Sequence, residues 1–331
     1  FGVGEPGAVM ENGRSVLHVA AEIGDLAAGL GLPREAVENA LSSALSKLRA
    51  VRATRKAPFV DSTVYTSWNA MAVVAYLDAW RAFGWESCRA FALATLDRLW
   101  KEARRPGRGI AHGVEQGAPD GLLDDNAQTL LAFTHAYEAT GDATHLERAR
   151  EIADVLWNEF RDAKTGGFFD TLDPDVRALA GVKPIQDAPT PAANSVAALG
   201  LARLGHLAGD EAALARAKET LEAFAGRATE YGLFAATHFR AMETIVDEPA
   251  KVVVVGEGPN AEALARAALA AWPPGALVLR VRAGGFVPEP ARAAASASFD
   301  GPRALVCRGA SCLPPVGSPT DLLRVLASPR A

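Results

Sequence analysis

Three segments of this sequence align with one another without a gap, and each runs from an asparagine to a glycine. They are NAMAVVAYLDAWRAFG from Asn69, NAQTLLAFTHAYEATG from Asn126 and NSVAALGLARLGHLAG from Asn194. Small and apolar residues fill all three segments, and alanine-rich sequences of this kind favour helices. Asparagine can cap the free amides of a first turn, and glycine adopts the left-handed conformation that ends a helix. We therefore expect three helices of equal length, each capped by its asparagine and ended by its glycine.

A second helical stretch follows each of these glycines, at residues 86–103, 143–162 and 211–228. Each pair of helices is followed by a return that is rich in glycine and hydrophobic residues: GRGIAHGVE, TGGFFDTL and EYGLFAAT. Further helices are expected at residues 33–52 and 234–246. The unit of helix, tight turn, helix and long return is longer than solenoid repeats, which run to about 34–47 residues. The pattern therefore favours a ring of helical hairpins, an α/α toroid, over a solenoid.

The pattern changes after residue 246. The runs KVVVVGEG, ALVLRVR and RALVCRG are typical of buried strands, and NAEALARAALAAW and SPTDLLRVLA are typical of helices. Strands that alternate with helices predict an α/β lobe. We therefore expect two domains, a mainly helical, partial α/α toroid at residues 1–246 and a small C-terminal α/β lobe at residues 247–331.

Charge and composition exclude several classes of partner. The net charge is -5 and the two signs are interspersed, so we expect no nucleic-acid partner. The sequence has no apolar stretch of about 20 residues, so no membrane span is expected, and no secretory leader is expected at its beginning. Because the chain begins at Phe1 and not at an initiator methionine, we interpret it as a fragment of a longer protein.

Three cysteines are too few for a disulfide framework. Cys307 and Cys312 bracket the end of an expected strand, but their spacing does not match a CxxC redox motif, and no further His or Cys pair completes a zinc site. We therefore interpret them as structural thiols and expect a reducing compartment, the cytoplasm. The sequence contains no HExxH-like spacing, so we expect no metal and no cofactor.

The candidate site lies where the inner helices of the toroid begin, beside the returns. Asp124 and Asp125 directly precede the second asparagine, and one acid is enough to stabilise a helix start. The other could bind a sugar hydroxyl or act as a general acid or base. His112 stands in the return GIAHGVE and can change its charge near neutral pH. The three repeats share their asparagine and glycine but differ at the residue directly before the asparagine, which is Trp68, Asp125 or Ala193. Trp68 and Asp125 are therefore the preferred candidates for ligand contact.

Other polar and aromatic residues of the returns and helix starts complete the candidate site. The candidate catalytic residues are Asp125, Asp124 and His112. The candidate substrate-binding residues are Trp68, Asn69, Phe169, Asp170, Asp187 and Asn194. Each of them has a structural alternative, as a helix cap, as a charge near a helix start or as core packing, and the sequence leaves these alternatives open.

Several motifs together resemble a known family. The segments DSTVYTSWNAMAVVAYLDA, LLDDNAQTLLAFTHAYEATGD, GGFFDT and DAPTPAANSVAALGLARL, and then KVVVVGE and CRGASCLPPV, occur in the order found in the C-terminal part of the YyaL-like family. These are thioredoxin-domain-containing proteins related to the spermatogenesis-associated thioredoxin-like proteins. The resemblance implies a thioredoxin-like domain followed by a six-hairpin, glycosidase-like (α/α) toroid. The thioredoxin-like domain and the first hairpins are absent from this sequence, so the implied fold is an incomplete (α/α)6 toroid.

The resemblance also implies a substrate class. The toroid is similar to those of sugar 2-epimerases and glycoside hydrolases, so carbohydrate is the implied substrate. The sequence departs from the family pattern, since Thr63 replaces a lysine, Ala70 a glycine and Ala192 a serine. Two readings follow: a carbohydrate-active toroid with acid/base chemistry or sugar binding at the mouth, or a non-catalytic binding or scaffold module of a thioredoxin-fused protein. An inactive fragment is a third. The expected partners are a small sugar-like ligand and the N-terminal thioredoxin-like domain with its adjoining hairpins.

Overall fold

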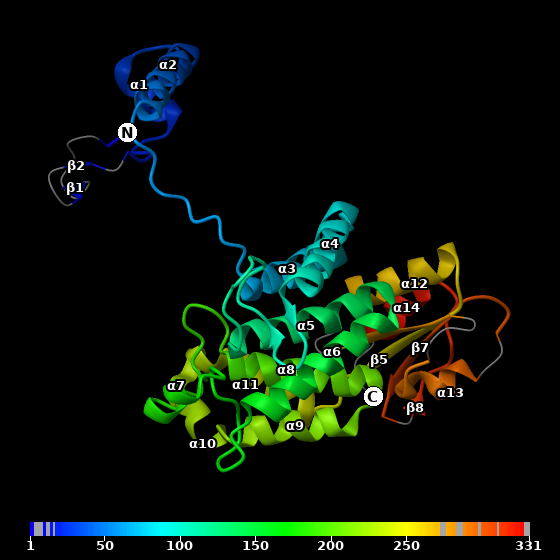
Figure 1. The fold of residues 1–331 in the computed structure, drawn as a ribbon. Helices are drawn as coiled ribbons and strands as arrows, with labels where there is room; N and C mark the ends of the chain where they lie inside the picture. Colours follow the sequence, from blue (N-terminus) through cyan, green and yellow to red (C-terminus); the bar gives the residue numbers. More distant parts are fainter. Residues whose placement is uncertain are drawn as a thin grey trace. The chain divides into compact units, whose positions relative to one another are not determined.

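The computed structural model describes residues 1–2, 9–10, 14–15, 17–271, 276–282, 287–296, 299–309 and 311–327. The chain forms two compact units, Phe1–Ser62 and Thr63–Ala331. In the first unit, β1 (Val9–Met10) pairs antiparallel with β2 (Arg14–Ser15), and α1 (Ile23–Leu30) packs against α2 (Arg34–Ala53) (Figure 1). The helix expected at residues 33–52 is therefore present as α2.

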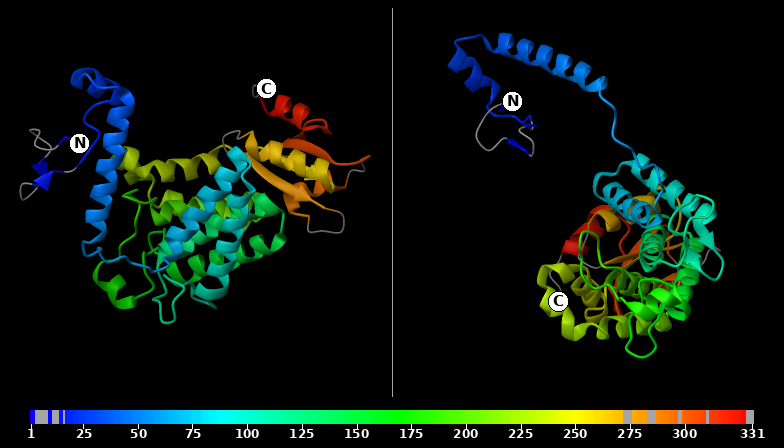
Figure 2. Two further views of the ribbon diagram at one scale, coloured as in Figure 1. Left: turned by 90° about the horizontal axis from the view of Figure 1, so that it is seen from above. Right: turned by 60° about the vertical axis from the view of Figure 1, so that its left-hand side comes forward.

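Three helical hairpins build the second unit. Their inner and outer helices are α3 (Thr66–Phe83) with α4 (Glu86–Ala103), α5 (Leu123–Thr140) with α6 (Ala143–Val155), and α8 (Ala193–Ala208) with α9 (Glu211–Glu222). A further inner helix, α11 (Ala236–Val246), follows them. The inner helices α3, α5, α8 and α11 pack side by side in that order, and each outer helix packs on the inner helix of its own hairpin (Figures 1 and 2). This arrangement confirms the repeat of hairpins that the sequence predicts.

Short elements connect the hairpins. They are β3 (Arg104–Arg105) and β4 (Gly109–Ile110), which pair antiparallel, then η2 (Leu156–Phe160), α7 (Pro174–Leu179), α10 (Ala225–Ala228) and η3 (Thr229–Ala235). Two of the expected outer helices are therefore divided, because α6 runs on into the π-helical turn η2 and α9 is followed by the separate helix α10. The inner helix α5 is buried along nearly its whole length, since α3, α6 and α8 all pack against it.

The asparagines of the repeat do not cap the helices, which corrects the expectation from the sequence. The three inner helices begin before their asparagines, and the N-cap residues are Tyr65, Leu122 and Ala192, without side-chain caps. Asn126 instead accepts a hydrogen bond from the backbone of Ile110 at 3.0 Å, and Asn194 accepts one from Phe168 at 2.7 Å. Both partners lie on the preceding return. Asn126 and Asn194 therefore fasten the preceding return to the first turn of their inner helix, whereas Asn69 donates to Tyr65 O at the start of its own helix.

The three glycines end the inner helices as expected. Gly84, Gly141 and Gly209 are left-handed C-caps, with φ of 72°, 70° and 68°. Glycine tolerates this conformation because it has no Cβ atom. At Gly141 a second constraint applies, since an added Cβ would lie 2.9 Å from the Cβ of Arg280.

We expect the substitution Gly141→Ala to lower the free energy of unfolding by about 2–3 kcal/mol, since it combines backbone strain with the clash against Arg280. The control is Gly107→Ala, because Gly107 also has a positive φ of 75° but nothing lies within 4 Å of its added Cβ. That variant should lose about 1 kcal/mol. Urea unfolding measures both losses, and equal losses would show that the close approach of Arg280 has no effect.

The C-terminal α/β lobe contains a sheet in the order β6-β5-β7-β8. Its strands are β5 (Lys251–Val255), β6 (Leu277–Val281), β7 (Arg303–Arg308) and β8 (Ser311–Cys312). β6 is parallel to β5, whereas β7 is antiparallel to β5 and to β8. The lobe is completed by α12 (Pro259–Ala270), η4 (Glu289–Ala291), α13 (Arg292–Ala295) and α14 (Pro319–Ala327). The fold is thus mainly α, an incomplete (α/α)6 toroid with a small α/β lobe, and the domain boundary at residue 247 stays a prediction.

Two cysteines of the lobe differ from the expectation. Cys307 and Cys312 form a disulfide and are not free thiols. The reason is the hairpin of β7 and β8, which places the two residues directly opposite each other. Cys88 is a free cysteine and is partly buried.

A buried ion pair connects two inner helices with the lobe. Arg203 of α8 pairs with Glu138 of α5, and its Nε donates to Thr134 Oγ1 at 3.2 Å. The second carboxylate oxygen of Glu138 accepts from the backbone nitrogen of Val278 in β6 at 2.9 Å. Glu138 is 1% exposed and Arg203 is 9% exposed. Because charges this deeply buried persist only when they are paired, these contacts fix α5, α8 and β6 to one another.

Candidate functional site

The returns bring their backbone to the starts of the inner helices. The backbone nitrogen of Thr66 donates to His112 O at 2.9 Å, and its hydroxyl donates to Ala111 O at 2.6 Å. At the next inner helix, the backbone nitrogen of Leu123 donates to Asp170 O at 2.9 Å. These bonds satisfy amides that a helix start otherwise leaves without partners. They also hold His112 and Asp170 beside the first turns of α3 and α5.

Asp125 and His112 form a hydrogen-bonded pair at this end of the toroid. Oδ2 of Asp125 lies 2.9 Å from His112 Nδ1, and its Oδ1 accepts from the backbone nitrogen of Ser67 at 3.0 Å. Asp125 is only 1% exposed, whereas the side chain of His112 is 34% exposed. A carboxylate on Nδ1 fixes the orientation of the imidazole and leaves Nε2 to face solvent or a ligand. The structure thus joins two of the three candidate catalytic residues.

Burial raises the pKa of Asp125 to about 6, against the opposing effect of the hydrogen bond from His112. Between pH 4 and 6, the unfolded carboxyl loses its proton while the native one retains it. The native state therefore binds more protons, and Asp125 lowers the stability as the pH rises through this window.

We expect Asp125→Asn to remove this pH dependence. Relative to the wild type, the variant should gain roughly 2–3 kcal/mol in its free energy of unfolding between pH 4 and pH 7. Urea unfolding of both proteins at the two pH values measures the difference. If the variant and the wild type differed by the same free energy of unfolding at pH 4 and at pH 7, the raised pKa of Asp125 would be contradicted.

Aromatic rings adjoin the pair. The ring centroid of Tyr65 lies 5.0 Å from that of Trp68 and 5.0 Å from that of His112. Trp68 is 61% exposed and belongs to the first turn of α3, where its neighbours Thr66 and Ser67 are buried. An exposed ring of this size next to a titratable pair is typical of a ligand-contacting surface. The structure thus connects the candidates Trp68 and His112 through the ring of Tyr65, which contacts both of them.

Three other candidates lie near the start of α5 but outside the pair. The carboxylate of Asp124 accepts from Gln128 Nε2 at 3.3 Å and is partly exposed. Asp170 contributes its backbone to the helix start, as described above. Two cations contact the ring of Phe169, since Arg177 Cζ lies 5.1 Å and Lys183 Nζ 5.9 Å from its centroid. Phe169 therefore already has charged side chains against its ring.

The last three candidates have structural partners. Both carboxylate oxygens of Asp187 accept from backbone nitrogens, of Ala192 at 2.7 Å and Thr237 at 2.8 Å. The side chain of Asn69 donates to Tyr65 O at 2.7 Å, and Asn194 fastens its return as described above. For these three residues, the contacts are structural, although neither asparagine forms the helix cap that the sequence predicts.

Two residues of the site were not identified from the sequence. Ser67 contributes its backbone nitrogen to Asp125, and any residue type could supply that group, so the sequence carries no signal for it. Tyr65 stands inside the motif VYTSWN and becomes part of the site through its ring contacts.

A second polar set was also missed. Asp78, His135 and Arg203 each stand nine positions after the asparagine of their repeat (78 − 69, 135 − 126, 203 − 194), and this shared position was a usable signal. His135 Nδ1 lies 3.8 Å from Asp78 Oδ1, and burial holds the pKa of His135 well below its usual value. These residues lie toward the ends of their helices, so they belong to the packing of the toroid and not to its mouth.

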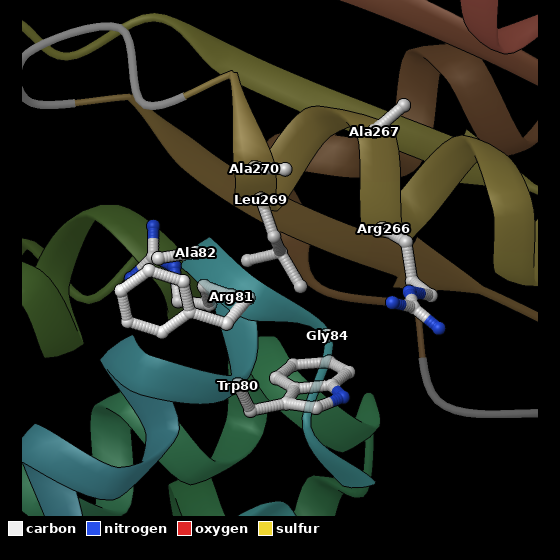
Figure 3. A pocket seen from close by; sticks show the side chains of 9 residues that line it. Trp80, Arg81, Ala82, Gly84, Arg266, Ala267, Leu269 and Ala270 are labelled. Atoms are coloured by element: carbon white, nitrogen blue, oxygen red, sulfur yellow. The ribbon is translucent and has the colours of Figure 1, made fainter.

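A cavity of about 300 Å³ lies at the other end of α3, against α12. Figure 3 shows Leu269 and Arg266 approaching it from α12, and Trp80 from α3. Trp80 Nε1 donates to Glu86 Oε1 at 2.8 Å, and Arg266 Nη1 lies 3.5 Å from the same oxygen. Because its polar groups are already paired in this way, we interpret the cavity as a packing gap between the toroid and the lobe.

The described part of the chain contains neither a metal-binding cluster nor a membrane-spanning helix. Among the described residues, no group of three or more His, Cys, Asp or Glu side chains is placed to hold a metal ion. Within the same ranges, no helix has both the length and the apolar character that crossing a bilayer requires.

The sequence is similar to those of longer proteins from mammals. Spermatogenesis-associated protein 20 of Homo sapiens is 26% identical over 335 residues, which is 95% of this chain and 42% of the human protein. Its counterpart in Mus musculus is 30% identical over 230 residues, which is 65% of this chain and 29% of the mouse protein. The chain is a homologue of spermatogenesis-associated protein 20. It spans less than half the length of these spermatogenesis-associated protein 20 relatives. No protein-family model matches the sequence.

Some solved structures resemble the chain more distantly. A GH76 alpha-mannanase of Bacteroides thetaiotaomicron is 18% identical with a TM-score of 0.46, covering 66% of this chain and 58% of its own. Cellobiose 2-epimerase of Bacillus thermoamylovorans is 14% identical with a TM-score of 0.42, covering 50% and 46%. A D-mannose isomerase is 17% identical with a TM-score of 0.41, covering 50% and 46%. The relation to spermatogenesis-associated protein 20, by contrast, rests on sequence and confirms the resemblance seen in the motifs.

Proposed function

We propose that this chain is a carbohydrate-active toroid in which His112 acts as the general acid or base and Asp125 is its positioning residue. The observation that carries the proposal is the bond between His112 Nδ1 and the buried Asp125 carboxylate at 2.9 Å. From the sequence, Trp68 and Asp125 are the preferred candidates for ligand contact. Since both oxygens of Asp125 are occupied and it is 1% exposed, we assign the direct contact to His112 and an indirect role to Asp125.

The chemistry of the pair supports acid/base work. With Asp125 ionised, Nδ1 carries the proton that it donates to the carboxylate, so Nε2 has a free lone pair. Nε2 can then take a proton from a sugar carbon or hydroxyl, and the carboxylate stabilises the imidazolium that forms. Nε2 can return the proton in a later step. The arrangement therefore supports a proton-transfer reaction such as epimerisation or isomerisation better than glycoside hydrolysis, which usually needs a second carboxylate.

A sugar fits the surface around the pair. The exposed ring of Trp68 offers an apolar face on which the C–H groups of a pyranose can pack, with Tyr65 and His112 beside it. The resemblance of the motifs implies the same substrate class. The proposal does not depend on the likeness to solved sugar enzymes, whose TM-scores lie below 0.5.

The test is a panel of reducing sugars and disaccharides, assayed by NMR for epimerisation, isomerisation and hydrolysis. We expect Trp68→Ala to raise KM for a converted sugar by about 10–100-fold with a smaller change in kcat, because the ring binds without taking part in proton transfer. Phe91→Ala is the matched control, since Phe91 is another ring that is 53% exposed, on α4. Equal effects of the two substitutions would contradict a sugar surface at Trp68.

A non-catalytic sugar-binding module is the second candidate. The observation that favours it is the difference in exposure, since Trp68 is 61% exposed whereas the Asp125 carboxylate is buried and cannot reach a ligand. In that case calorimetry detects sugar binding that Trp68→Ala abolishes, while no sugar of the panel is converted. Conversion that depends on His112 would exclude it.

A further inference from the structure

The hairpin of β7 and β8 carries a disulfide that the proposed function does not use. Cys307 and Cys312 face each other across the two strands and are bonded. Cys307 is 4% exposed, whereas Cys312 lies exposed on the short edge strand β8. One partner of the bond is therefore accessible to an external thiolate, and the other is shielded by the sheet.

At this position the disulfide contributes little to the stability of the fold. A disulfide stabilises a fold mainly by closing a long loop of the unfolded chain, and only residues 308–311 separate these two cysteines. The strands also have other connections. Leu313 N donates to Val306 O at 2.9 Å, and β7 pairs with β5 along the whole of β5. The sheet therefore has hydrogen bonds that hold β7 and its hairpin without the bond.

We propose that the Cys307–Cys312 disulfide is a reversible redox centre that exchanges with an external dithiol through Cys312. A thiolate of the dithiol attacks Sγ of Cys312 and forms a mixed disulfide, while the bond to Cys307 breaks and Cys307 leaves as a thiolate that takes up a proton. The second thiol of the dithiol then attacks the dithiol's own bridged sulfur. This closes the dithiol into a disulfide and releases Cys312. The dithiol loses two electrons, and the cysteine pair gains them.

The full chain with Cys88→Ser tests the exchange, because the cysteine pair then supplies every thiol. After treatment with dithiothreitol in native buffer, alkylation and mass spectrometry should find two modified cysteines, against none in untreated protein. Oxidised dithiothreitol should restore the bond. Reduction should change the Tm by less than about 5 °C, because the loop is short. The proposal is overturned by free thiols in untreated protein, by a bond that resists dithiothreitol until the chain unfolds, or by a larger change in Tm.

Single variants in the same background test the direction of attack. In Cys307→Ser, the remaining Cys312 should react with Ellman's reagent at least about tenfold faster than Cys307 does in Cys312→Ser, because accessibility controls the rate. Equal rates, or a faster Cys307, would contradict attack at Cys312. If Cys307→Ser or Cys312→Ser fails to fold, the exchange experiment on the Cys88→Ser chain still tests the proposal, because that chain keeps both cysteines.

Discussion

Replacing His112 with alanine should lower kcat for a converted sugar by about 10²–10⁴-fold, with a much smaller change in KM. The bond to Asp125 at 2.9 Å holds Nδ1, so Nε2 is the nitrogen that transfers the proton. Without the imidazole, no group at that position takes up the proton, and the barrier rises. The sugar still meets the exposed ring of Trp68, so binding persists. Steady-state kinetics on the sugar found in the panel measures both constants.

Two variants complete this experiment. Asp125→Asn preserves the shape of the site, but its amide donates to Nδ1 and so moves the imidazole proton to Nε2, which removes the base. We expect a loss of kcat close to that of the alanine variant. His18→Ala is the matched control, because His18 is an exposed histidine of the first unit. In the wild type, kcat should fall as the pH drops through about 6, where Asp125 takes up its proton. Full kcat in His112→Ala would refute the assignment.

Replacing Arg203 with methionine should lower the free energy of unfolding by about 3–5 kcal/mol. The substitution leaves Glu138 without its cation at a position that is 1% exposed. A buried charge that has lost its partner costs far more than a surface charge, because neither water nor a counter-ion solvates it. Glu138 also holds the backbone of Val278 in β6, so the loss extends to the contact between α5 and the lobe. Urea unfolding followed by circular dichroism measures it.

The double variant Arg203→Met with Glu138→Gln provides the critical comparison. It should recover most of the loss, because the neutral amide can still accept from Val278 and no unpaired charge remains. Arg98→Met is the surface control, since Arg98 and its partner Glu102 are 54% and 45% exposed in their side chains, and we expect at most about 1 kcal/mol for it. A single Arg203 variant as stable as this surface control would show that the buried pair does not hold the helices together.

Much of the toroid could be predicted from the sequence because its signals are local. The repeated pattern of small apolar residues and C-cap glycines predicted three inner helices and where each of them ends. It did not predict where they begin, and the expected equal length was wrong, since α3 and α5 have 18 residues and α8 has 16. The asparagines were found by the same pattern but were assigned the wrong role. They lie inside the first turns, and Asn126 and Asn194 bind backbone of the returns. A side-chain contact across the 26 residues from Phe168 to Asn194 leaves no trace in a local pattern.

The site could be predicted only residue by residue. His112 and Asp125 were both named, but their bond crosses 13 positions of irregular return, where no periodicity fixes the geometry. The burial of Asp125, which decides its role, depends on how α3 and α5 pack. The partnership of Arg203 with Glu138 crosses 65 positions and depends on the same packing. Tertiary packing, and not local propensity, determines these contacts.

The shared offset of Asp78, His135 and Arg203 shows that the inner helices have a common phase. Because every residue adds the same rise and the same rotation to a helix, residues nine positions after the asparagine lie at the same height along the helix axis and at the same angle around it, both measured from that asparagine. One residue inserted in the middle of α5 would rotate its two ends by about 100° against each other. Asn126 would still reach Ile110, but Glu138 would turn away from Arg203. The contacts at the two ends of α5 therefore fix the number of residues between Asn126 and Glu138, and a change in chain length disturbs the packing less in the returns on either side.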